Sequence, residues 1–428
     1  MYGRELLSGC RWLLIALFLL YAAKRRSLTA LTLVGIVAGA EVGHDWPKVA
    51  IAFQVFASIF LRLIKAIIAP LLFGTLVVGI AGHADVKKVG RMGVKALIYF
   101  EIVSTLAMIM GLVAINVSRA GVGVHFPSAV SKEISSPRLR SPGELLVDIF
   151  PENIAKSIAE DQILQVVVFS ILFGVALALV PETKRGPMLA FAESLTETMM
   201  KFTNLIMLLA PVAVFGAMAY TVGSMGTSVV IPLTRLLATM YVTLIGFTAI
   251  VLLPIAILVG VPVRRFVAAV AEPVSIAFAT ASSEAALPRA IEQMEKLGVA
   301  RETVAFVLPT GYSFNLDGSS VYQALALVFV AQAAGIHLSI GQQTLMFLTL
   351  LASSKGTAGV ARASLVVVLG VAPSFGLPSG PILLLFGIDQ LMDMGRTAIN
   401  VLGNCLATMV IARWEGETVP FLAELPES

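Results

Sequence analysis

The stretch GIDQLMDMGRTAINVLGN (residues 387–404) places charged and amide side chains inside a strongly apolar part of the chain. Successive residues of an α-helix are turned by about 100°, so five of these side chains would share a sector of roughly 80° on one face. They are Asp389, Asp393, Arg396, Asn400 and Asn404. An ionisable side chain at the centre of a bilayer costs about 2.5–3.5 kcal/mol on insertion scales, so such residues persist where they pair or bind something.

The composition of the whole chain agrees with a membrane setting. Of its 428 residues, 58% are apolar and 13% are charged, whereas an ordinary globular domain is about one-quarter charged. We therefore predict an all-α polytopic membrane protein. The formal net charge of +4 gives no reason to expect a nucleic-acid partner. Because a helix needs about 20 mostly apolar residues to cross a bilayer, the candidate spans are 49–83, 93–118, 163–181, 196–222, 232–261, 321–335, 343–375 and 381–412.

Clusters of Lys and Arg set the orientation, because the cytoplasmic loops of membrane proteins are enriched in them. We assign to the cytoplasmic side the clusters at 24–26, 87–88, 184–185 and 264–265. The polar stretch 119–150 is then an outer loop. In residues 1–26 an apolar core precedes the charges and no signal-cleavage site is evident, so we expect this N-terminal extension to be an interfacial helix. Residues 416–428 are expected to form a cytoplasmic tail, with both termini cytoplasmic.

Two further segments share one design, with two apolar arms and a polar tip of small residues. They are residues 263–294, with Ser282–Ser283 at the tip, and residues 347–376, with Ser353–Ser354. No arm is comfortably long enough to span alone, so we interpret both as re-entrant hairpins, which point to a transporter binding site near mid-membrane. Between them NLDGS (315–319) interrupts an apolar run. A helix broken here frees carbonyl oxygens, which are hard ligands for a small cation.

The polar row has two interpretations. In the simpler one, Asp393 and Arg396 form a buried structural pair three residues apart. That pair alone explains neither Asn400 and Asn404 nor the hairpin tips and the broken helix. Together these features describe a cavity that offers one cation, one anion and several neutral polar groups. The matching ligand is an acidic amino acid, because a guanidinium suits bidentate carboxylate binding and Asp393 suits an ammonium group.

These motifs resemble those of the dicarboxylate/amino acid:cation symporter family, the bacterial relatives of glutamate transporters, and favour its proton/glutamate branch. The resemblance runs from about residue 27 to the C-terminus. It implies eight transmembrane helices plus two re-entrant helical hairpins, a homotrimer in the cell inner membrane, and an elevator-type motion of a transport domain against a scaffold. The motifs that carry it are, in order, FLRLIKAIIAPLLFGTLVVGIAG (60–82), ASSEAALP (281–288), NLDGS (315–319), SKGTAGVARAS (354–364) and DMGRTAINVLGN (393–404).

The resemblance also implies how the chain is divided. Scaffold helices 1 and 2 fall in 27–86 and scaffold helices 4 and 5 in 151–226, with helix 3 of the transport domain between them in 87–118. The rest of the transport domain is 227–415. It holds helix 6, hairpin 1 at about 263–297, helix 7, hairpin 2 at about 340–376, and helix 8.

Carried over to the matching positions, the resemblance implies a substrate site. Arg396 would bind the side-chain carboxylate and Asp393 the α-amino group. The α-carboxylate would be bound by Asn400 and by the hairpin 1 tip at Ser282 and Ser283. Further contacts would come from Ser319, Thr397 and, as a closing lid, the backbone of Gly359 and Val360.

Asp393 also bears on the choice of substrate. The C4-dicarboxylate carriers of the family, which share YFEIVST (99–105) with this chain, typically lack that aspartate because succinate has no ammonium group to neutralise. Its presence favours glutamate or aspartate, and Arg396 argues against neutral amino acids. Import of a C4-dicarboxylate such as succinate, fumarate or malate stays open as an alternative.

Several positions depart from the sodium-coupled members of the family. Asn404 and Val103 stand where those members have an aspartate and a threonine that ligate sodium, and a lost carboxylate weakens cation binding at low dielectric. The candidate proton carriers are Glu101, within an apolar span, and Glu284, at a hairpin tip, because a carboxyl group buried in an apolar setting binds a proton near neutral pH. Their plainer interpretations are a buried carboxyl bonded to a neighbouring helix and a solvated tip residue. We expect protons as the coupling ion and no cofactor; the ligands of a sodium alternative would be Asn315, Asp317, Asn400 and Asn404.

Other function classes fit less well. An enzyme using Ser283 with Glu284 or Asp393 lacks a histidine base, since the four histidines lie at span ends or in loops. A channel would need charged rings or a carbonyl-filter sequence, and the sequence has neither. We therefore expect a transporter that is not an enzyme. Its partners would be its small-molecule substrate, membrane lipid and further copies of itself.

Overall fold

A computed structural model of the chain describes residues 2–25, 27–81, 88–124, 147, 150–160, 163–354, 363–378 and 380–417. Every regular element in these residues is a helix, which confirms the predicted all-α fold. The elements are α1 (Tyr2–Arg25), α2 (Leu28–Asp45), α3 (Pro47–Ala50), η1 (Ile51–Phe53), α4 (Gln54–Ala81), α5 (Lys88–Ser118), α8 (Ile154–Ala159), α9 (Ile163–Leu179), α10 (Glu182–Met207), α11 (Ala210–Met225), η2 (Thr227–Val229), α12 (Val230–Phe247), η3 (Thr248–Leu252), α13 (Leu253–Leu258), α14 (Val263–Thr280), α15 (Ser283–Lys296), α16 (Arg301–Phe314), α17 (Asp317–Ala333), α18 (Ile340–Ser354), α19 (Ala363–Val371), η4 (Ala372–Phe375) and α20 (Gly380–Trp414).

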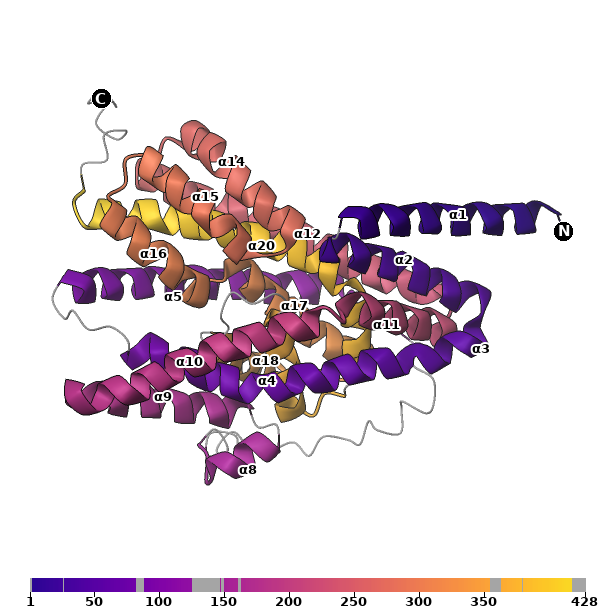
Figure 1. The fold of residues 1–428 in the computed structure, drawn as a ribbon, viewed down its shortest axis with the longest axis horizontal. Coiled ribbons are helices and arrows are strands. Elements are labelled where there is room, and N and C mark those ends of the chain that lie inside the picture. The colour runs from indigo at the N-terminus through magenta and orange to yellow at the C-terminus, as the bar shows by residue number, and fades with distance from the viewer. Residues whose placement is uncertain are drawn as a thin grey trace.

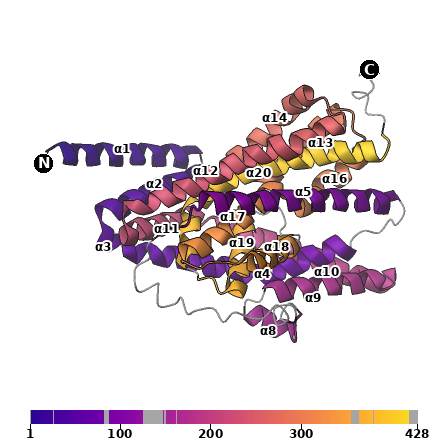
Figure 2. The same ribbon diagram turned by 180° about the vertical axis from the view of Figure 1, so that it is seen from behind.

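Packing divides most of the helices into two groups (Figure 1). In the first group, α2 packs along α11, and α4 packs against α9, α10 and α11. In the second group, α14, α15, α16 and α17 surround α20, while α5 and α12 pack against α17. Seen from behind, α5, α12 and α20 lie above the layer formed by α4, α9 and α10 (Figure 2). The polar row of α20 therefore lies within the second group.

Close backbone packing between α2 and α11 holds the first group together. Gly35, Gly39 and Gly43 lie four residues apart, so they form one stripe on α2, and all three are buried. A Cβ at Gly35 would lie 2.6 Å from the Pro211 carbonyl oxygen, and one at Gly43 would lie 2.7 Å from Val222 Cβ. Small residues at this spacing let helix backbones approach closely, as they do in membrane-embedded helix pairs.

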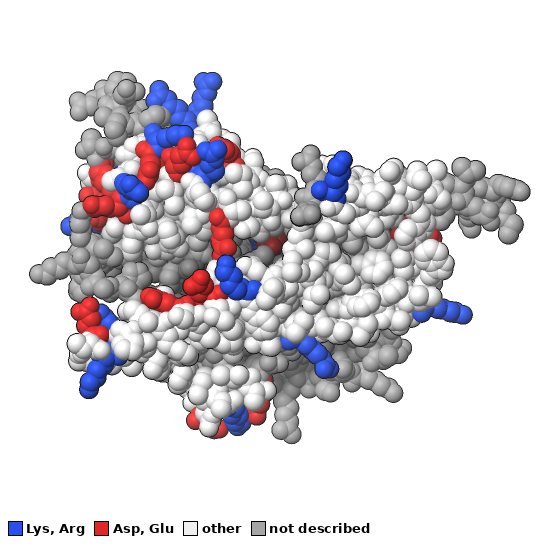
Figure 3. All heavy atoms as spheres, viewed as in Figure 1, with Lys and Arg blue, Asp and Glu red and all other residues white. Residues whose placement is uncertain are grey.

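The surface of the molecule has the character of a membrane protein. Charged side chains gather mainly at one end and leave most of the visible face uncharged (Figure 3). By length and composition, two helical segments among the described residues can cross a membrane, Arg91–Ser118 and Thr227–Leu258. Helices α10 and α11, which are bent by 53° at their junction, pass the same test as a pair. The expected eight transmembrane helices and two re-entrant hairpins stay a prediction.

Acidic side chains fasten the end of α20 to two neighbouring helices. Glu415 Oε2 lies 2.7 Å from Arg91 Nη2, and Glu415 Oε1 lies 2.7 Å from Lys95 Nζ, both on α5. Hydrogen bonds from these two cations lower the pKa of Glu415 below its ordinary value. Glu417 accepts a hydrogen bond of 3.0 Å from the Ala300 N–H, at the start of α16. The ends of α5, α16 and α20 are thereby joined.

We expect Gly39→Ala to destabilise the fold, because the new methyl group would overlap the Phe215 carbonyl oxygen of α11. Overpacking of this kind costs about 1–3 kcal/mol. The midpoint of thermal unfolding in detergent, followed by intrinsic fluorescence, should therefore fall. Gly186→Ala in α10 is the matched control, since a Cβ there meets nothing within 4 Å. An unchanged midpoint for Gly39→Ala would contradict the close approach of α2 and α11.

Candidate functional site

The polar row lies on α20 and is covered by protein. The segment is helical throughout, as predicted. Helices α14, α15, α16 and α17 pack around α20, which keeps the charges away from lipid as membrane-embedded ionisable groups require. All five side chains are buried, with exposed fractions of 0% for Asp389, 4% for Asp393, 1% for Arg396, 4% for Asn400 and 0% for Asn404.

Arg396 is the centre of a charged cluster. Its Nε donates to Asp393 Oδ1 at 2.8 Å, and its Nη1 donates to Asp389 Oδ1 at 3.1 Å. The Thr397 hydroxyl also donates to Asp393 Oδ1, at 3.2 Å. The guanidinium lies over the Tyr322 ring of α17, 4.2 Å from its centroid, an arrangement that stabilises a cation. The sequence spacing of three and seven residues brings all three charged groups to one side of α20.

The Asp393–Arg396 pair of the simpler interpretation is thus formed, but it does not use every donor of the guanidinium. Arginine has five N–H donors, and Arg396 Nη2 is buried without a hydrogen-bond partner among the described residues. A buried donor left unsatisfied is costly, so this nitrogen can bind a further oxygen. Two carboxylates against one guanidinium leave one formal negative charge when all are ionised. The cluster therefore suits a guest that carries both a carboxylate and an ammonium group.

A second cluster, made of amides, lies at the break between α16 and α17. Helix α16 ends at Phe314 and α17 begins at Asp317, which confirms the break that NLDGS predicts. Asn400 Nδ2 donates to Ser319 Oγ at 3.0 Å, and the Ser319 N–H donates to Asn400 Oδ1 at 3.2 Å. This reciprocal pair fixes the first turn of α17 to α20.

The Asn404 side chain donates to the carbonyl oxygen of Asn315, a residue that lies between α16 and α17. Its Nδ2 donates to the Asn315 carbonyl oxygen at 3.1 Å and to the Asn400 carbonyl oxygen at 2.9 Å. Its Oδ1 accepts from Asn315 Nδ2 at 3.3 Å, and that same Nδ2 donates to Asp317 Oδ2 at 3.2 Å. An N–H group therefore already meets the carbonyl that a cation would need. An aspartate at position 404 has no N–H to donate and would leave that oxygen to a metal ion.

Two glycines let α17 and α20 touch beside these amides. A Cβ at Gly318 would overlap the Arg396 carbonyl oxygen, and one at Gly403 would overlap Asp317 Oδ2. Gly318 lies within NLDGS, the stretch that predicts the broken helix. The structure adds that Gly318 is a point of close backbone approach, which no larger residue permits.

The predicted hairpin 1 tip is a tight turn between α14 and α15. Ala281 has a φ of +51°, in the left-handed region that residues other than glycine seldom adopt. The Ser282 hydroxyl accepts from the Ala285 N–H at 3.3 Å and caps α15, while Ser283 is buried. Both arms pack against α20. Ser282 thus has a structural role as a helix cap, which the substrate prediction does not include.

The predicted lid residues Gly359 and Val360 lie outside the described residues. Helix α18 ends before them at Ser354, and α19 begins after them at Ala363. Ser353, in the last turn of α18, is fully buried, and its hydroxyl has no hydrogen-bond partner among the described residues. Helices α18 and α19 therefore flank the predicted lid residues in the sequence, and the role of those residues stays a prediction.

The two candidate proton carriers have exposed side chains in the single chain. Glu101 lies next to Ile102, which is 54% exposed on α5, whereas Phe100 and Val103 are buried. Glu101 therefore faces away from the interior of the single chain, because the helical period turns residue 101 away from the inward face, and its role as a proton carrier stays a prediction. Glu284 lies in the first turn of α15. Its exposed side chain agrees with the plainer interpretation, that of a solvated residue at the tip.

Tyr322 is the residue of the charged cluster that the sequence interpretation missed. It is fully buried, and its ring supports the Arg396 guanidinium. Its position in the sequence could have identified it, because Tyr322 comes three residues after the predicted site residue Ser319 and the two therefore share a face of one helix.

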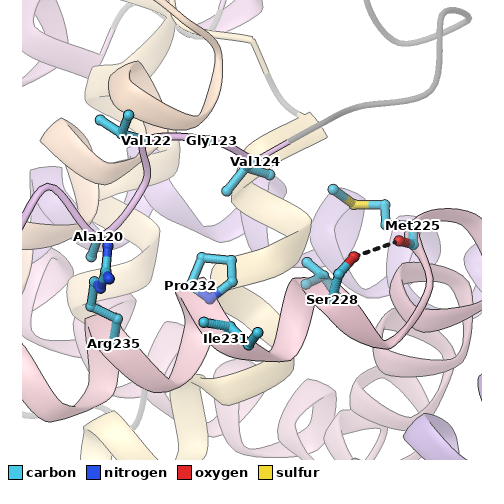
Figure 4. Close-up of a pocket in the computed structure, with 10 residues that line it drawn as sticks. Ala120, Val122, Gly123, Val124, Met225, Ser228, Ile231, Pro232 and Arg235 are labelled. Carbon is cyan, nitrogen blue, oxygen red and sulfur yellow. Dashed lines mark hydrogen bonds between the residues drawn. The ribbon is translucent and has the colours of Figure 1, made fainter.

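A pocket of about 280 Å³ lies elsewhere, between the turn after α5 and the start of α12 (Figure 4). Arg235 extends from α12 towards Ala120 (Figure 4), and the Ser228 hydroxyl donates to the Met225 carbonyl oxygen at 3.2 Å. The other lining residues are mostly apolar, and none of the predicted site residues is among them. This pocket therefore offers no match to a small acidic zwitterion.

Residues 28–414 match the sequence model of the sodium:dicarboxylate symporter family. The proton/sodium-glutamate symport protein of Bacillus caldotenax is 40% identical over 408 residues, which cover 92% of this chain and 96% of that protein. The proton/glutamate-aspartate symporter of Escherichia coli K12 is 40% identical over 396 residues (89% and 90%). The C4-dicarboxylate transport protein of Paraburkholderia phymatum is 41% identical over 394 residues (90% and 92%). The chain thus belongs to the sodium:dicarboxylate symporter family, a family of transporters and not of enzymes.

Proposed function

We propose that this chain is a secondary active symporter of the inner membrane that imports glutamate or aspartate together with protons, by an elevator-type alternating-access mechanism. The observation that carries the proposal is the buried Arg396 guanidinium, which contacts Asp393 and whose Nη2 has no hydrogen-bond partner among the described residues. A guest with a carboxylate and an ammonium group matches this pair of charges.

Substrate binding exchanges partners within the charged cluster. The side-chain carboxylate of the substrate accepts from Arg396 Nη2 and competes with Asp393 for Nε. Asp393 then accepts the substrate ammonium group, with the Thr397 hydroxyl beside it. Asp389 keeps its contact with Nη1, so the guanidinium stays over the Tyr322 ring during the exchange. Charge-assisted bonds of this kind are about twice as strong as neutral ones, and the low dielectric of the site strengthens them further.

Asp393 is the residue on which the choice of substrate class depends. Relatives of both kinds, glutamate symporters and C4-dicarboxylate transporters, are about equally similar to this chain, so identity alone does not choose. A dicarboxylate brings two negative charges to a cluster that already contains Asp389 and Asp393. An acidic amino acid brings an ammonium group that one of these carboxylates can bind. A C4-dicarboxylate symporter is the second candidate, and the similarity to transporters of that name supports it.

Protons are the coupling ion that the amide cluster favours. Asn404 donates to the Asn315 and Asn400 carbonyl oxygens, so an N–H group stands where a sodium ion would be coordinated. Glu284 is the stronger candidate proton carrier, because it lies in the first turn of α15, next to the hairpin 1 tip. Glu101 faces outward from α5 and is the weaker one.

The elevator part of the proposal rests on the two helix groups. The group of α2, α4, α9, α10 and α11 corresponds to the scaffold of a homotrimer. The group around α20 corresponds to the transport domain, with α14–α15 as hairpin 1 and α18–α19 as hairpin 2. The Thr29 hydroxyl, in the first turn of α2, donates to the Thr280 carbonyl oxygen at the hairpin 1 tip at 3.4 Å. Because the preceding cluster at 24–26 marks this end of α2 as cytoplasmic, we infer an inward-facing conformation.

Uptake of labelled glutamate into proteoliposomes tests the function. A proton gradient, acidic outside, should drive accumulation in buffers free of sodium, and collapsing the gradient with a protonophore should stop it. Empty liposomes are the control. A strict requirement for sodium would overturn the proton assignment, and a failure to move glutamate while succinate is accumulated would favour the second candidate.

Asp393→Ser should weaken the binding of glutamate far more than the binding of succinate. A hydrogen bond to a charged group contributes about 1.5–3 kcal/mol, so the apparent affinity for glutamate should fall by roughly 10- to 100-fold. Competition of each unlabelled compound against labelled substrate gives both affinities in one assay. Glu417→Gln, at the far end of α20, is the matched control for losing a carboxylate. An equal loss for glutamate and succinate would count against the ammonium contact.

Asn404→Asp should make transport respond to sodium. The substitution removes the N–H donors that meet the Asn315 and Asn400 carbonyl oxygens and adds a carboxylate, which together form hard oxygen ligands for a cation. Uptake by this variant, measured as sodium replaces choline at constant pH, should rise with sodium concentration. Asn404→Ala, which removes the donors without adding a charge, is the matched control. A sodium response identical to that of the unmodified chain would refute the assignment.

A further inference from the structure

Helix α1 lies outside the part of the chain that the family match covers, since that match begins at residue 28. It ends at Arg25, and α2 begins at Leu28. The chain reverses direction between the two helices, so α1 lies alongside α2. The N-terminal part of α1 extends past the end of α2 that leads into α3 (Figures 1 and 2). The two helices therefore form an antiparallel pair.

Polar and aromatic contacts fix this pairing near the far end of α2. Arg11 Nε lies 2.6 Å from Glu41 Oε1, and Arg11 Nη2 lies 3.3 Å from Asp45 Oδ1. The Trp12 indole N–H donates to Asp45 Oδ2 at 2.9 Å, and the rings of Trp12 and Trp46 lie 5.3 Å apart. Two carboxylates thus neutralise the one cation in the middle of α1.

The composition of α1 argues against a helix that lies in the membrane interface. Such a helix needs a charged face opposite its apolar face, but residues 12–23 (WLLIALFLLYAA) contain no charged residue. A helix that is apolar on all sides belongs inside a protein or a bilayer. Exposed apolar side chains point in most directions around α1; they are Leu13, Leu14, Leu17, Phe18, Leu19, Leu20 and Tyr21.

The length and surroundings of α1 fit a crossing of the bilayer. Helix α1 is not one of the two segments that are long and apolar enough in the described residues to cross alone. Its sequence nevertheless has a run of about 18 mostly apolar residues, 6–23, broken only by Arg11, which is within the range that spans a bilayer. Its partner α2 packs along α11, which belongs to a helix pair apolar enough to span. Helix α1 packs against this same helix α2.

We propose that α1 is an additional membrane-spanning helix, surrounded by lipid acyl chains on its exposed sides and tied to α2 through Arg11. It crosses in the direction opposite to α2. The cluster at 24–26 stays cytoplasmic, so residue 4 lies on the outer side, opposite residue 428. This replaces the expectation of an interfacial helix with a cytoplasmic start.

Cysteine labelling tests this topology in the full chain. The chain has two cysteines, of which Cys10 is exposed and Cys405 is buried, so Cys10→Ser gives a background with no exposed thiol. Arg4→Cys and Ser428→Cys are each added to that background. Right-side-out and inside-out membrane vesicles are treated with a membrane-impermeant maleimide, and glutamate uptake by each variant checks that it is folded.

The proposal requires the two cysteines to react from opposite sides, position 4 in right-side-out vesicles and position 428 in inside-out vesicles. Reaction of both in inside-out vesicles alone would overturn it in favour of a helix on the cytoplasmic face. Reaction of position 4 in neither preparation would also overturn it, because the start of α1 would then be embedded in the bilayer. Lys24→Cys in the same background is the matched control, and it should react in inside-out vesicles.

Discussion

Arg396 carries a positive charge where lipid offers nothing to solvate it, and two carboxylates of its own helix meet that charge. A single unpaired ion at this depth would be far too costly, whereas a paired one is tolerated when further contacts satisfy it. The Tyr322 ring below the guanidinium and the helices packed around α20 supply those contacts. One nitrogen, Nη2, has no hydrogen-bond partner in the described part of the chain. In the function that we propose it binds the substrate, and the dry surroundings make each polar contact to that substrate strong.

In the function that we propose, the same helix separates substrate recognition from ion coupling along its length. Towards the end of α20, Asn400 and Asn404 fasten the broken helix instead of leaving its carbonyl oxygens free. A neutral amide can act both as donor and as acceptor, so it satisfies a helix break without a metal ion. In this interpretation the site is complete without sodium, and the energy for transport has to come from another ion.

The local sequence pattern was enough to predict the features that depend only on the helical repeat. The row on α20, its common face and the break at NLDGS needed only the spacing of residues such as Asp389, Arg396 and Asn404. Contacts between distant segments did not follow from that spacing: the ring of Tyr322 under Arg396, the approach of Gly318 to α20, and the pairing of α1 with α2. The outward direction of Glu101 did not follow from the sequence either, because an apolar stretch does not say which of its faces points inward.

A structure of the protein with glutamate bound tests the central claim most directly. If Arg396 and Asp393 form the recognition site, density for glutamate will lie against them, with a carboxylate on the guanidinium and the ammonium group on Asp393. The present 2.8 Å contact between Arg396 Nε and Asp393 Oδ1 will then have lengthened or been shared. Glutamate bound elsewhere, with the Asp389–Arg396–Asp393 cluster unchanged, would show that the cluster is structural and would contradict the claim.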